Sequence, residues 1–570
     1  MAFNTQHTSA GVYFSINDRG AQANLVVGGV ATLVMPLPLG IVGKNMRVLA
    51  SEVNELLGPS VGRYWQNVEI LKLLASQARY LNITRIGHNV KFAATMVTTF
   101  NNFATTRNLA AGLDNLDTVL FNDKDIMLVA ARHAGDNGKN YYCAFEPDLT
   151  DPDGESFNFY VYRVGYKTPI HTYRGCTLFY KKDENNEQKF IEEMVNNDHL
   201  CPVMVFVNED HYKLKTDPHY LAINAIGGGP RDPNAPNAPH GQLLHGNDGD
   251  EIDIYSDDEE VRNRSIALFM DGWENYRDWE TVRVGIACDG GYAHPAIASK
   301  VAEIAEDRMD CISNNNVPVQ WQYHEDAIAY RYGRKLLDGM GLNMSTAFAT
   351  LNNNDIEYRA SSVERNMWVP CSVAMTYAML ECDKDRSWLA PAGLNRGGFP
   401  WGLRLRHEAP QPVRDILNDN QLNFPIHFKS PVAPNDAVGI YMWNADTMNG
   451  KRSPLDDIGV QRLLSVITES VRVSFLRYNF ENDSTVLRRE LKTDLDDNVL
   501  QPISNGRGLD WYESVVDSRN NTNASSANGD LYVDVFLDPT RYTKRIHLNL
   551  NVAPTGNLKA VVSLIERGQV

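Results

Sequence analysis

The stretch from residue 451 to residue 553 carries the clearest periodicities of this 570-residue chain. Its first part repeats apolar residues at helical spacing, at Val460, Leu463, Leu464, Ile467, Val471 and Phe475. Ser453 is expected to cap this helix, with Pro454 at its first position. Asn482–Ser484 offers the cap for a second helix. The spacing therefore predicts two consecutive helices.

Three short strands are expected after these helices, because apolar and polar residues alternate there. The first is expected in the run GLDWYESVV, and an Asn-rich turn at Asn520–Asn523 follows it. The second strand places Leu531, Val533, Val535 and Leu537 on one face. The last strand, Arg545–Val552, places Ile546, Leu548, Leu550 and Val552 on one face. The stretch is thus predicted to be an α+β unit that ends in an exposed strand.

Composition excludes some classes of function. The formal net charge of −17 argues against nucleic-acid binding, which favours basic patches. The 7 cysteines show no metal-ligand spacing such as C-x-x-C, so we expect reduced thiols and synthesis in a cytosol. Leu25–Gly43 lacks charged residues, but repeated Gly and Pro indicate strand, turn and strand rather than a membrane span.

The rest of the chain divides by composition. Residues 1–24 are predicted to be a polar arm with one short apolar strand at Val12, Tyr13, Phe14 and Ile16. Residues 25–105 together with 265–450 are predicted to form a middle α/β domain, beginning with a buried hairpin, a short helix after Ser51 and a longer helix. Residues 106–264 are expected to be an inserted β-rich outer domain, and residues 554–570 a tail.

Two segments refine this division. A β-α-β unit is predicted in the middle domain. Its first strand is Thr281–Cys288, its helix has Ile297, Val301 and Ile304 on one face, and its second strand is Asp310–Asn316. The loop-rich run from Gly227 to Glu260 has few periodic apolar residues, so it is expected to be dispensable for folding. The fold class is therefore a multidomain α+β and α/β protein.

Several patterns have a catalytic and a structural interpretation. Gly58–Gly62 matches G-x-S-x-G, but a helix precedes it where a nucleophile elbow needs a strand. Cys288–Gly291 ends a strand where α/β sheets bind ligands, yet it lacks the further glycines or the Lys of a phosphate loop. Loop histidines and the acidic run Asp248–Glu260 fit no standard metal spacing. We therefore expect no catalytic residue, cofactor or metal.

A set of short motifs, in the same order along the chain, resembles contractile tail sheath proteins of large tailed bacteriophages. The motifs are GVYFSIND (Gly11–Asp18), VLASEVNELLG (Val48–Gly58), WVPCSVAMTYAMLECD (Trp368–Asp383), RSWLAPAGLNRG (Arg386–Gly397), SPLDDIGVQRLL (Ser453–Leu464), VDSRNNT (Val516–Thr522) and the ending Asp538–Val552. The family motif includes Trp388, Pro391, Gly393, Asn395, Arg396 and Gly397. Residues 106–264 match the family poorly.

The resemblance implies a structural subunit of a virion, not an enzyme. Such subunits form hexameric rings stacked helically around a tail tube, between a baseplate and a tail terminator, and contraction drives the tube through the host envelope. The two apolar strands near the termini would link subunits. The C-terminal domain would face the tube, with Arg462, Arg472, Arg477, Arg488 and Arg489 as candidate contacts. Neither nucleic acid nor direct membrane insertion is expected.

Two alternatives remain open at this stage. One is the sheath of a related injection machine, of the bacteriocin or secretion type. The other is an α/β hydrolase or nucleotide-using enzyme built on residues 265–450.

Overall fold

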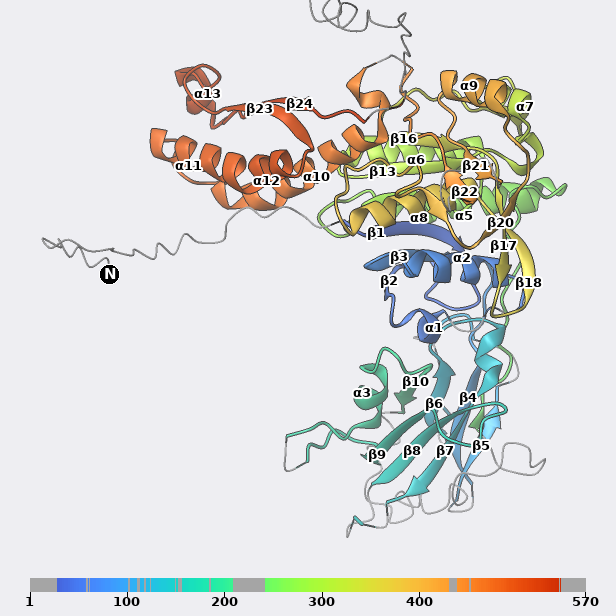
Figure 1. Cartoon of the computed structure of the whole chain (residues 1–570). Coiled ribbons are helices and arrows are strands. Elements are labelled where there is room, and N and C mark those ends of the chain that lie inside the picture. Colours follow the sequence, from blue (N-terminus) through green and yellow to red (C-terminus); the bar gives the residue numbers. More distant parts are fainter. Residues whose placement is uncertain are drawn as a thin grey trace, which may run out of the picture.

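The computed structural model describes residues 28–542 and residue 544, apart from internal gaps. The gaps are 58–59, 61, 101–102, 110–112, 117–118, 123–124, 149, 152–155, 184–185, 209–240, 430–437 and 451–452. Figure 1 shows three bodies: a middle body, a lower body built mostly from residues 91–250, and a C-terminal body from residue 453 onward. The predicted linking strands at Val12–Ile16 and Arg545–Val552 lie outside the described residues.

A six-stranded sheet forms the centre of the middle body. Its order is β16 (Ala349–Asn352), β13 (Ile312–Asn316), β12 (Ile286–Cys288), β1 (Val30–Pro36), β3 (Tyr80–Ile86) and β2 (Asn45–Leu49). Adjacent strands pair in parallel except β2, which is antiparallel to β3. The predicted β-α-β unit is confirmed, because β12 and β13 are parallel neighbours joined by α6 (Pro295–Arg308).

The predicted hairpin in residues 25–105 is wrong. β1 and β2 follow each other in sequence but do not pair, since β3 lies between them. The strand at Tyr80–Ile86 was not predicted, yet it is buried along its whole length and pairs with both. Local alternation shows that a strand exists, whereas the choice of partner depends on distant sequence.

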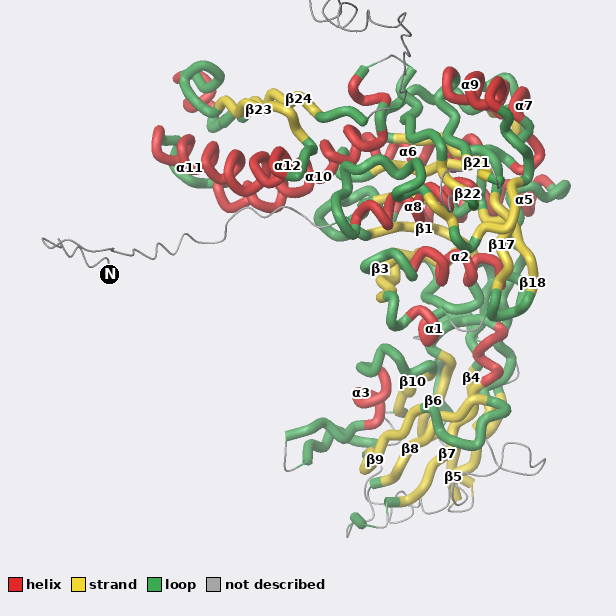
Figure 2. Tube along the Cα trace, viewed as in Figure 1, coloured by secondary structure: helices red, strands yellow, loops and turns green. Residues whose placement is uncertain are grey.

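Helices cover both faces of this sheet (Figure 2). α2 (Trp65–Ala75) and α8 (Cys371–Asp383) pack on one face, and α5 (Glu259–Glu274) and α6 pack on the other. α1 (Val53–Leu56) follows Ser51 as predicted. α8 lies within Trp368–Asp383, one of the stretches that carry the family resemblance, and it is buried on nearly all sides.

Smaller elements surround the central layers. They are α7 (His324–Arg331), α9 (Gln411–Asp419), the hairpin β14 (Leu336–Leu337) and β15 (Met340–Gly341), the sheet β18 (Arg365–Val369), β17 (Ile356–Ala360) and β20 (Gly402–Leu405), and the sheet β19 (Gly398–Phe399), β22 (Gly439–Met442) and β21 (Pro425–Phe428). Both three-stranded sheets are antiparallel. They give the middle body outward-facing sheet surfaces in addition to its helices.

The lower body consists of two antiparallel sheets around one apolar core. One sheet has the order β10 (Val203–Val207), β6 (Asp125–Ala131), β4 (Ala94–Phe100) and β5 (Phe103–Asn108), and the other has the order β11 (Gly241–Gln242), β7 (Tyr141–Pro147), β8 (Phe157–Arg163) and β9 (His171–Cys176). The short helix α3 (Ile191–Asn196) packs beside β10. Because β4 pairs with β6, the first sheet of this body begins N-terminal to residue 106.

The acidic run Asp248–Glu260 is not a dispensable loop. Ile252 and Ile254 are 7% and 2% exposed and belong to the apolar core under α5. Asp258 caps α5, because its carboxylate accepts the Glu260 N–H at 2.9 Å. Ile252 and Ile254 alternate with acidic residues and pack in the core under α5. The acidic composition of the run therefore did not indicate that it is part of the folded structure.

The C-terminal body has helices on one side and a two-stranded sheet on the other (Figure 1). Its elements are α10 (Ile458–Phe475), α11 (Thr485–Leu495), α12 (Gln501–Asn505), β23 (Leu509–Val515), α13 (Asn523–Asn528) and β24 (Asp534–Pro539). The predicted cap at Ser484 is confirmed on α11, whereas Ser453 caps a separate 3-10 turn and Asp457 stands at the N-cap position of α10. α12 and α13 were not predicted.

Candidate functional site

The carboxyl edge of the six-stranded sheet is the place where α/β proteins most often bind ligands. Asp289 follows β12 at this edge and is 1% exposed. Its carboxylate accepts hydrogen bonds from the Ser372 hydroxyl at 2.6 Å, the Gly291 N–H at 2.9 Å and the Asn316 N–H at 2.6 Å. Burial raises the pKa of Asp289 to about 6, although these hydrogen bonds favour the charged form.

A second buried carboxylate, Asp355, stands beside the first. One of its oxygens accepts from the Gln322 amide at 2.6 Å and from the Asn316 amide at 3.1 Å, and Arg406 lies 3.3 Å from the other. The Cys371 N–H, at the start of α8, also donates to it at 3.3 Å. Burial raises the pKa of Asp355. Both acids thus lie at the N-terminus of α8, where the helix dipole favours negative charge.

The chain itself fills this edge. A Cβ added at Gly291, which has φ +90°, would lie 2.3 Å from the Pro370 ring just before α8. A phosphate loop would need that space for its ligand. The start of α8 therefore closes the position that the Cys288–Gly291 pattern offered for a nucleotide, and the polar groups there are bonded to one another.

The G-x-S-x-G pattern also has a structural role. Ser60 lies between α1 and α2, is 2% exposed, and forms a hydrogen bond with Glu69. The Lys72 ammonium donates to the Ser60 hydroxyl at 2.9 Å. A nucleophile elbow requires a strand before the serine and an exposed hydroxyl. Neither is found at this position, where α1 precedes a buried side chain.

Metal and thiol chemistry have little support in the part of the chain that the structure describes. No group of three or more His, Cys, Asp or Glu residues there could hold a metal ion. The seven cysteines are all buried and free, and burial raises the pKa of each thiol.

No helix among the described residues is both long and apolar enough to span a bilayer.

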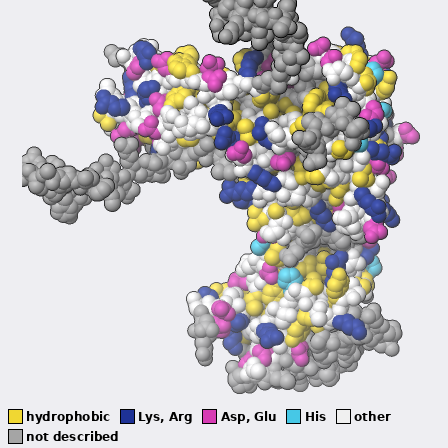
Figure 3. Space-filling model, viewed as in Figure 1, with side chains coloured by type: hydrophobic (Ala, Val, Ile, Leu, Met, Phe, Trp, Pro, Cys, Tyr) yellow, Lys and Arg dark blue, Asp and Glu magenta, His cyan; other side chains and the backbone are white. Residues whose placement is uncertain are grey.

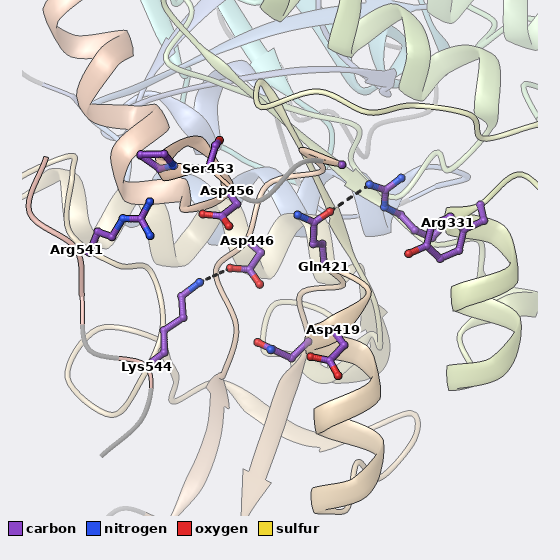
Figure 4. A pocket seen from close by; sticks show the side chains of 12 residues that line it. Arg331, Asp419, Gln421, Asp446, Ser453, Asp456, Arg541 and Lys544 are labelled. Atoms are coloured by element: carbon purple, nitrogen blue, oxygen red, sulfur yellow. Dashed lines mark hydrogen bonds and ion pairs between the residues drawn. The ribbon is translucent and has the colours of Figure 1, made fainter. Parts of the chain in front are cut away.

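A cavity of about 650 Å³ lies where the C-terminal segment runs over the middle body (Figure 4). Its charged side chains turn toward one another: the Lys544 ammonium lies 2.6 Å from Asp446 and 2.6 Å from Asp457. On the far wall Arg331 donates to the Met448 carbonyl at 2.9 Å. Such pairing joins chain segments across the cavity.

The family motif lies at the junction of the middle and C-terminal bodies. Trp388 packs against the apolar core of the C-terminal body, and its indole N–H donates to the Gly506 carbonyl at 3.3 Å. The Gly393 N–H donates to the Met442 carbonyl at 2.9 Å, and the Gly397 N–H donates to the Gly393 carbonyl at 2.9 Å. Pro391 is buried, Asn395 is exposed, and Arg396 donates to the Ala390 carbonyl at 3.4 Å. The motif is therefore a joint, not a reaction centre.

The five candidate tube-facing arginines occupy different environments. Arg462 is 5% exposed and forms an ion pair with Asp383 of the middle body, so it cannot contact another chain. Arg472 lies over the Trp279 ring, 5.0 Å from its centroid, and 3.6 Å from Asp310. Arg477 and Arg488 form ion pairs with Asp494 and Asp483, near the turn between α10 and α11, and Arg489 is exposed.

A polar seam joins α10 to the middle body. Besides the Arg462–Asp383 pair, the Arg283 guanidinium donates to Glu469 at 3.1 Å. Asp310 accepts from Arg308 at 2.9 Å in the same seam. α10 therefore has two buried faces, an apolar one toward β23 and β24 and a charged one toward the middle body. The sequence analysis gave all five arginines as candidate tube contacts and did not foresee the charged face toward the middle body.

The β23–β24 sheet presents an outward face that sequence reasoning also missed. Trp511, Tyr532 and Phe536 are 55%, 53% and 55% exposed there. The signal was present in the run LYVDVFLDP, where Tyr532 and Phe536 stand at the positions that alternate with the packed apolar residues. The fold defines the class: a multidomain protein of mixed α/β structure, whose small C-terminal sheet has two strands among the described residues.

Comparisons with known proteins agree with that class. No protein-family model matches the chain. The tail sheath protein of Enterobacteria phage T4 is 24% identical over 302 residues, which cover 50% of this chain and 44% of that protein. The tail sheath protein of Vibrio phage KVP40 is 24% identical over 312 residues, which cover 51% of this chain and 45% of that protein. The chain thus spans a little under half the length of the curated relatives it matches.

A solved structure shares the fold. The crystal structure of the sheath tail protein of Listeria innocua has a TM-score of 0.51, with 8% identity over 91% of this chain and 96% of that one. The resemblance to contractile tail sheath proteins, predicted from the motifs, is therefore confirmed. These relatives are structural sheath proteins and not enzymes.

Proposed function

We propose that the chain is the repeating structural subunit of a contractile phage tail sheath. The observation that carries this proposal is the similarity to two phage tail sheath proteins, and it is supported by a C-terminal sheet that has only two strands among the described residues. In this proposal copies of the chain form hexameric rings stacked helically around a tail tube, with the baseplate and the tail terminator at the ends. The subunit is made in the host cytoplasm and becomes part of the virion.

The linkage between subunits follows from the small sheet. A sheet of two strands is marginally stable in water and leaves backbone N–H and C=O groups unpaired at each outer edge. β23 and β24 form such a sheet within the described residues. Strands of neighbouring subunits would complete it, through Val12, Tyr13, Phe14 and Ile16 at one terminus and Ile546, Leu548, Leu550 and Val552 at the other.

The C-terminal body would face the tail tube. Arg477, Arg488 and Arg489 lie where α10 turns into α11, at the end of the body that is remote from the middle body (Figure 1). Their charge would meet an acidic tube surface, with Arg472 closer to the seam. Arg462 is left out of this proposal because it is buried.

Contraction would need no ATP. Joints made of backbone hydrogen bonds persist while the packed bodies rotate past one another, so an extended assembly can be metastable with respect to a contracted one. A small free-energy difference at each interface would add up over many identical subunits. This motion would drive the tube through the host envelope and deliver the genome.

The test is electron microscopy of the purified full chain in negative stain, over a range of protein concentrations. Long striated tubes or stacked rings are the expected result. Particles that stay monomeric at every concentration, in buffers of low and high ionic strength, would contradict the proposal.

A further inference from the structure

We propose that the outward face of the β23–β24 sheet docks on the outward face of the β18–β17–β20 sheet of a second copy of this chain. The inference rests on the proposed function, because it names one contact between sheath subunits. It concerns packing of sheet faces and is separate from the strand linkage at sheet edges. We call the first surface the acidic aromatic face and the second the arginine–tryptophan face.

The acidic aromatic face consists of Trp511, Glu513, Asp534, Phe536 and Asp538. Asp538 lies opposite Trp511 and Phe536 lies opposite Glu513 in the antiparallel register, so the rings and the carboxylates alternate across the two strands. Both rings are 55% exposed, although their neighbours Val535 and Leu537 pack inward. Figure 3 shows hydrophobic and acidic side chains together over β23 and β24.

Two half-exposed aromatic rings on one small sheet face indicate an interaction surface. Large apolar side chains of a monomer are normally scattered, and a contiguous group with a polar rim marks an interaction surface. The only cation within 4 Å of these carboxylates, among the described residues, is Arg519, 3.7 Å from Glu513. The face therefore favours a partner with cations that can also stack on aromatic rings, and arginine meets both needs.

The arginine–tryptophan face consists of Arg359, Trp368, Arg404 and Arg406, with Glu357 between them. Glu357 lies opposite both Trp368 and Arg404, which places the three side chains in one row across the sheet. The guanidinium groups of Arg406 and Arg404 lie 4.3 and 5.5 Å from the Trp368 ring centroid. Arg404 is 66% exposed and already forms an ion pair with Glu357, which leaves part of its guanidinium facing outward, and Arg359 is also exposed.

Position excludes contact between the two faces of one chain. Figure 1 places β23 and β24 at one end of the molecule, and β17 and β18 at the opposite side of the middle body. Lys and Arg side chains gather over β17 and β18 in Figure 3. Two complementary surfaces on opposite sides of one subunit form a heterologous contact, which closes into rings or continues as a helix.

The chemistry of the two faces matches. Charge-assisted hydrogen bonds from guanidinium to carboxylate are among the strongest in proteins, and Trp368 holds two of the guanidinium groups in place before contact. Trp511 and Phe536 would then stack on the arginines and on Trp368. An acidic partner such as nucleic acid would be repelled by the carboxylates of the first face.

Charge reversal tests this pairing in the full chain. The first variant is Asp534→Lys with Asp538→Lys, and the second is Arg359→Glu with Arg404→Glu. Each variant alone brings like charges together at every contact, so we expect at least a tenfold loss of polymerised protein. A one-to-one mixture restores opposite charges when the two variants alternate, so we expect tubes from the mixture.

The controls are Asp497→Lys and Arg334→Glu, which reverse exposed charges outside both faces. They are expected to polymerise like the unchanged chain, and melting curves show that every variant is folded. If the variants of either face polymerise alone, or if their mixture does not recover, the inference is overturned while the proposed function stands. If the unchanged chain forms no polymer, both are overturned.

Disulfide trapping gives a second measurement that needs no charge reversal. A chain with Asp538→Cys and Arg359→Cys should form a ladder of covalent oligomers on oxidation, because the seven native cysteines are buried and do not compete. Each single-cysteine variant should give at most dimers. Absence of the ladder in oxidised assemblies would overturn the inference even if a reversed variant failed to fold.

Discussion

Arg462 on α10 and Asp383 at the end of α8 form a buried ion pair that joins the C-terminal body to the middle body. The same Asp383 accepts the Gly29 N–H at 2.8 Å, immediately before β1. Three segments far apart in sequence therefore meet at one carboxylate.

Replacing Asp383 by alanine tests this junction. Removing one partner of a buried pair leaves the other charge uncompensated, which costs about 3–5 kcal/mol. We expect Asp383→Ala to lower the free energy of unfolding by that amount in a denaturant titration. The double change Asp383→Leu with Arg462→Met should recover most of the loss, since it leaves no unpaired charge. Asp483→Ala, which breaks the more exposed pair with Arg488, should cost less than about 1 kcal/mol.

The family motif offers a test of packing. A Cβ added at Gly506 would lie 2.7 Å from the Trp388 ring, so Gly506→Ala should push the indole out of place. Overpacking of this kind costs about 1–3 kcal/mol. The expected result is a lower melting temperature together with a red-shifted tryptophan emission. Asn505→Ala, next to it and exposed, is the matched control and should leave both unchanged. Equal melting temperatures for the two variants would contradict the placement of Trp388.

The acidic run gives a prediction opposite to the one that its composition suggested. Ile254→Ala removes a side chain that is 2% exposed in the core below α5, which should cost about 2–5 kcal/mol. Asp257→Ala, three residues on and exposed, should change stability by less than about 0.5 kcal/mol. Denaturant titration of both variants measures the difference. A similarly small effect of both variants on the free energy of unfolding would show that the run is dispensable for folding.

Asp289 gives a prediction about pH. Its pKa in the folded chain is raised to about 6 by burial, above the ordinary value of 3.8, so the folded state binds a proton more readily than the unfolded state. This group therefore lowers stability as pH rises from about 4 to about 6, by an amount on the order of 3 kcal/mol, and adds no further change above that window. Unfolding free energies of the unchanged chain and of Asp289→Asn should diverge in slope between pH 4 and 6 and run parallel above about pH 7. Parallel curves throughout would show that the pKa of Asp289 is the same in the folded and the unfolded chain.

Local periodicity predicted the elements whose apolar face alone explains them. α6 and α10 were located because Ile297, Val301 and Ile304, or Leu463 and Ile467, repeat at helical spacing, whereas α8 is buried on nearly all sides and was not located by periodicity. The cap at Ser484 was predictable for the same reason, since a cap bonds within its own first turn.

Pairing over long sequence distances was not predictable in this way. β2 pairs with β3 and not with β1. Arg462 is buried because it pairs with Asp383, a residue 79 positions earlier in the chain. The Cys288–Gly291 pattern suggested a ligand edge, yet the start of α8 fills it. In each case the deciding contact comes from a segment whose position depends on the complete fold.

The strand predicted at Arg545–Val552 provides the last test. It lies outside the described residues, so its linking role stays a prediction from alternation and from the open edges of β23 and β24. Proline at both Leu548 and Asn549 removes two adjacent N–H donors, which point to opposite edges of a strand. Each lost hydrogen bond should cost roughly 0.5–1.5 kcal/mol net. If the strand pairs with a neighbour, this loss falls on every joint of the assembly while the monomer is spared. We therefore expect an unchanged melting temperature of the monomer and no tubes by electron microscopy on the same sample. The control places alanine at both positions, which keeps both donors and should allow tubes. A monomer that melts at a markedly lower temperature in the proline variant alone would show that the strand pairs within its own subunit.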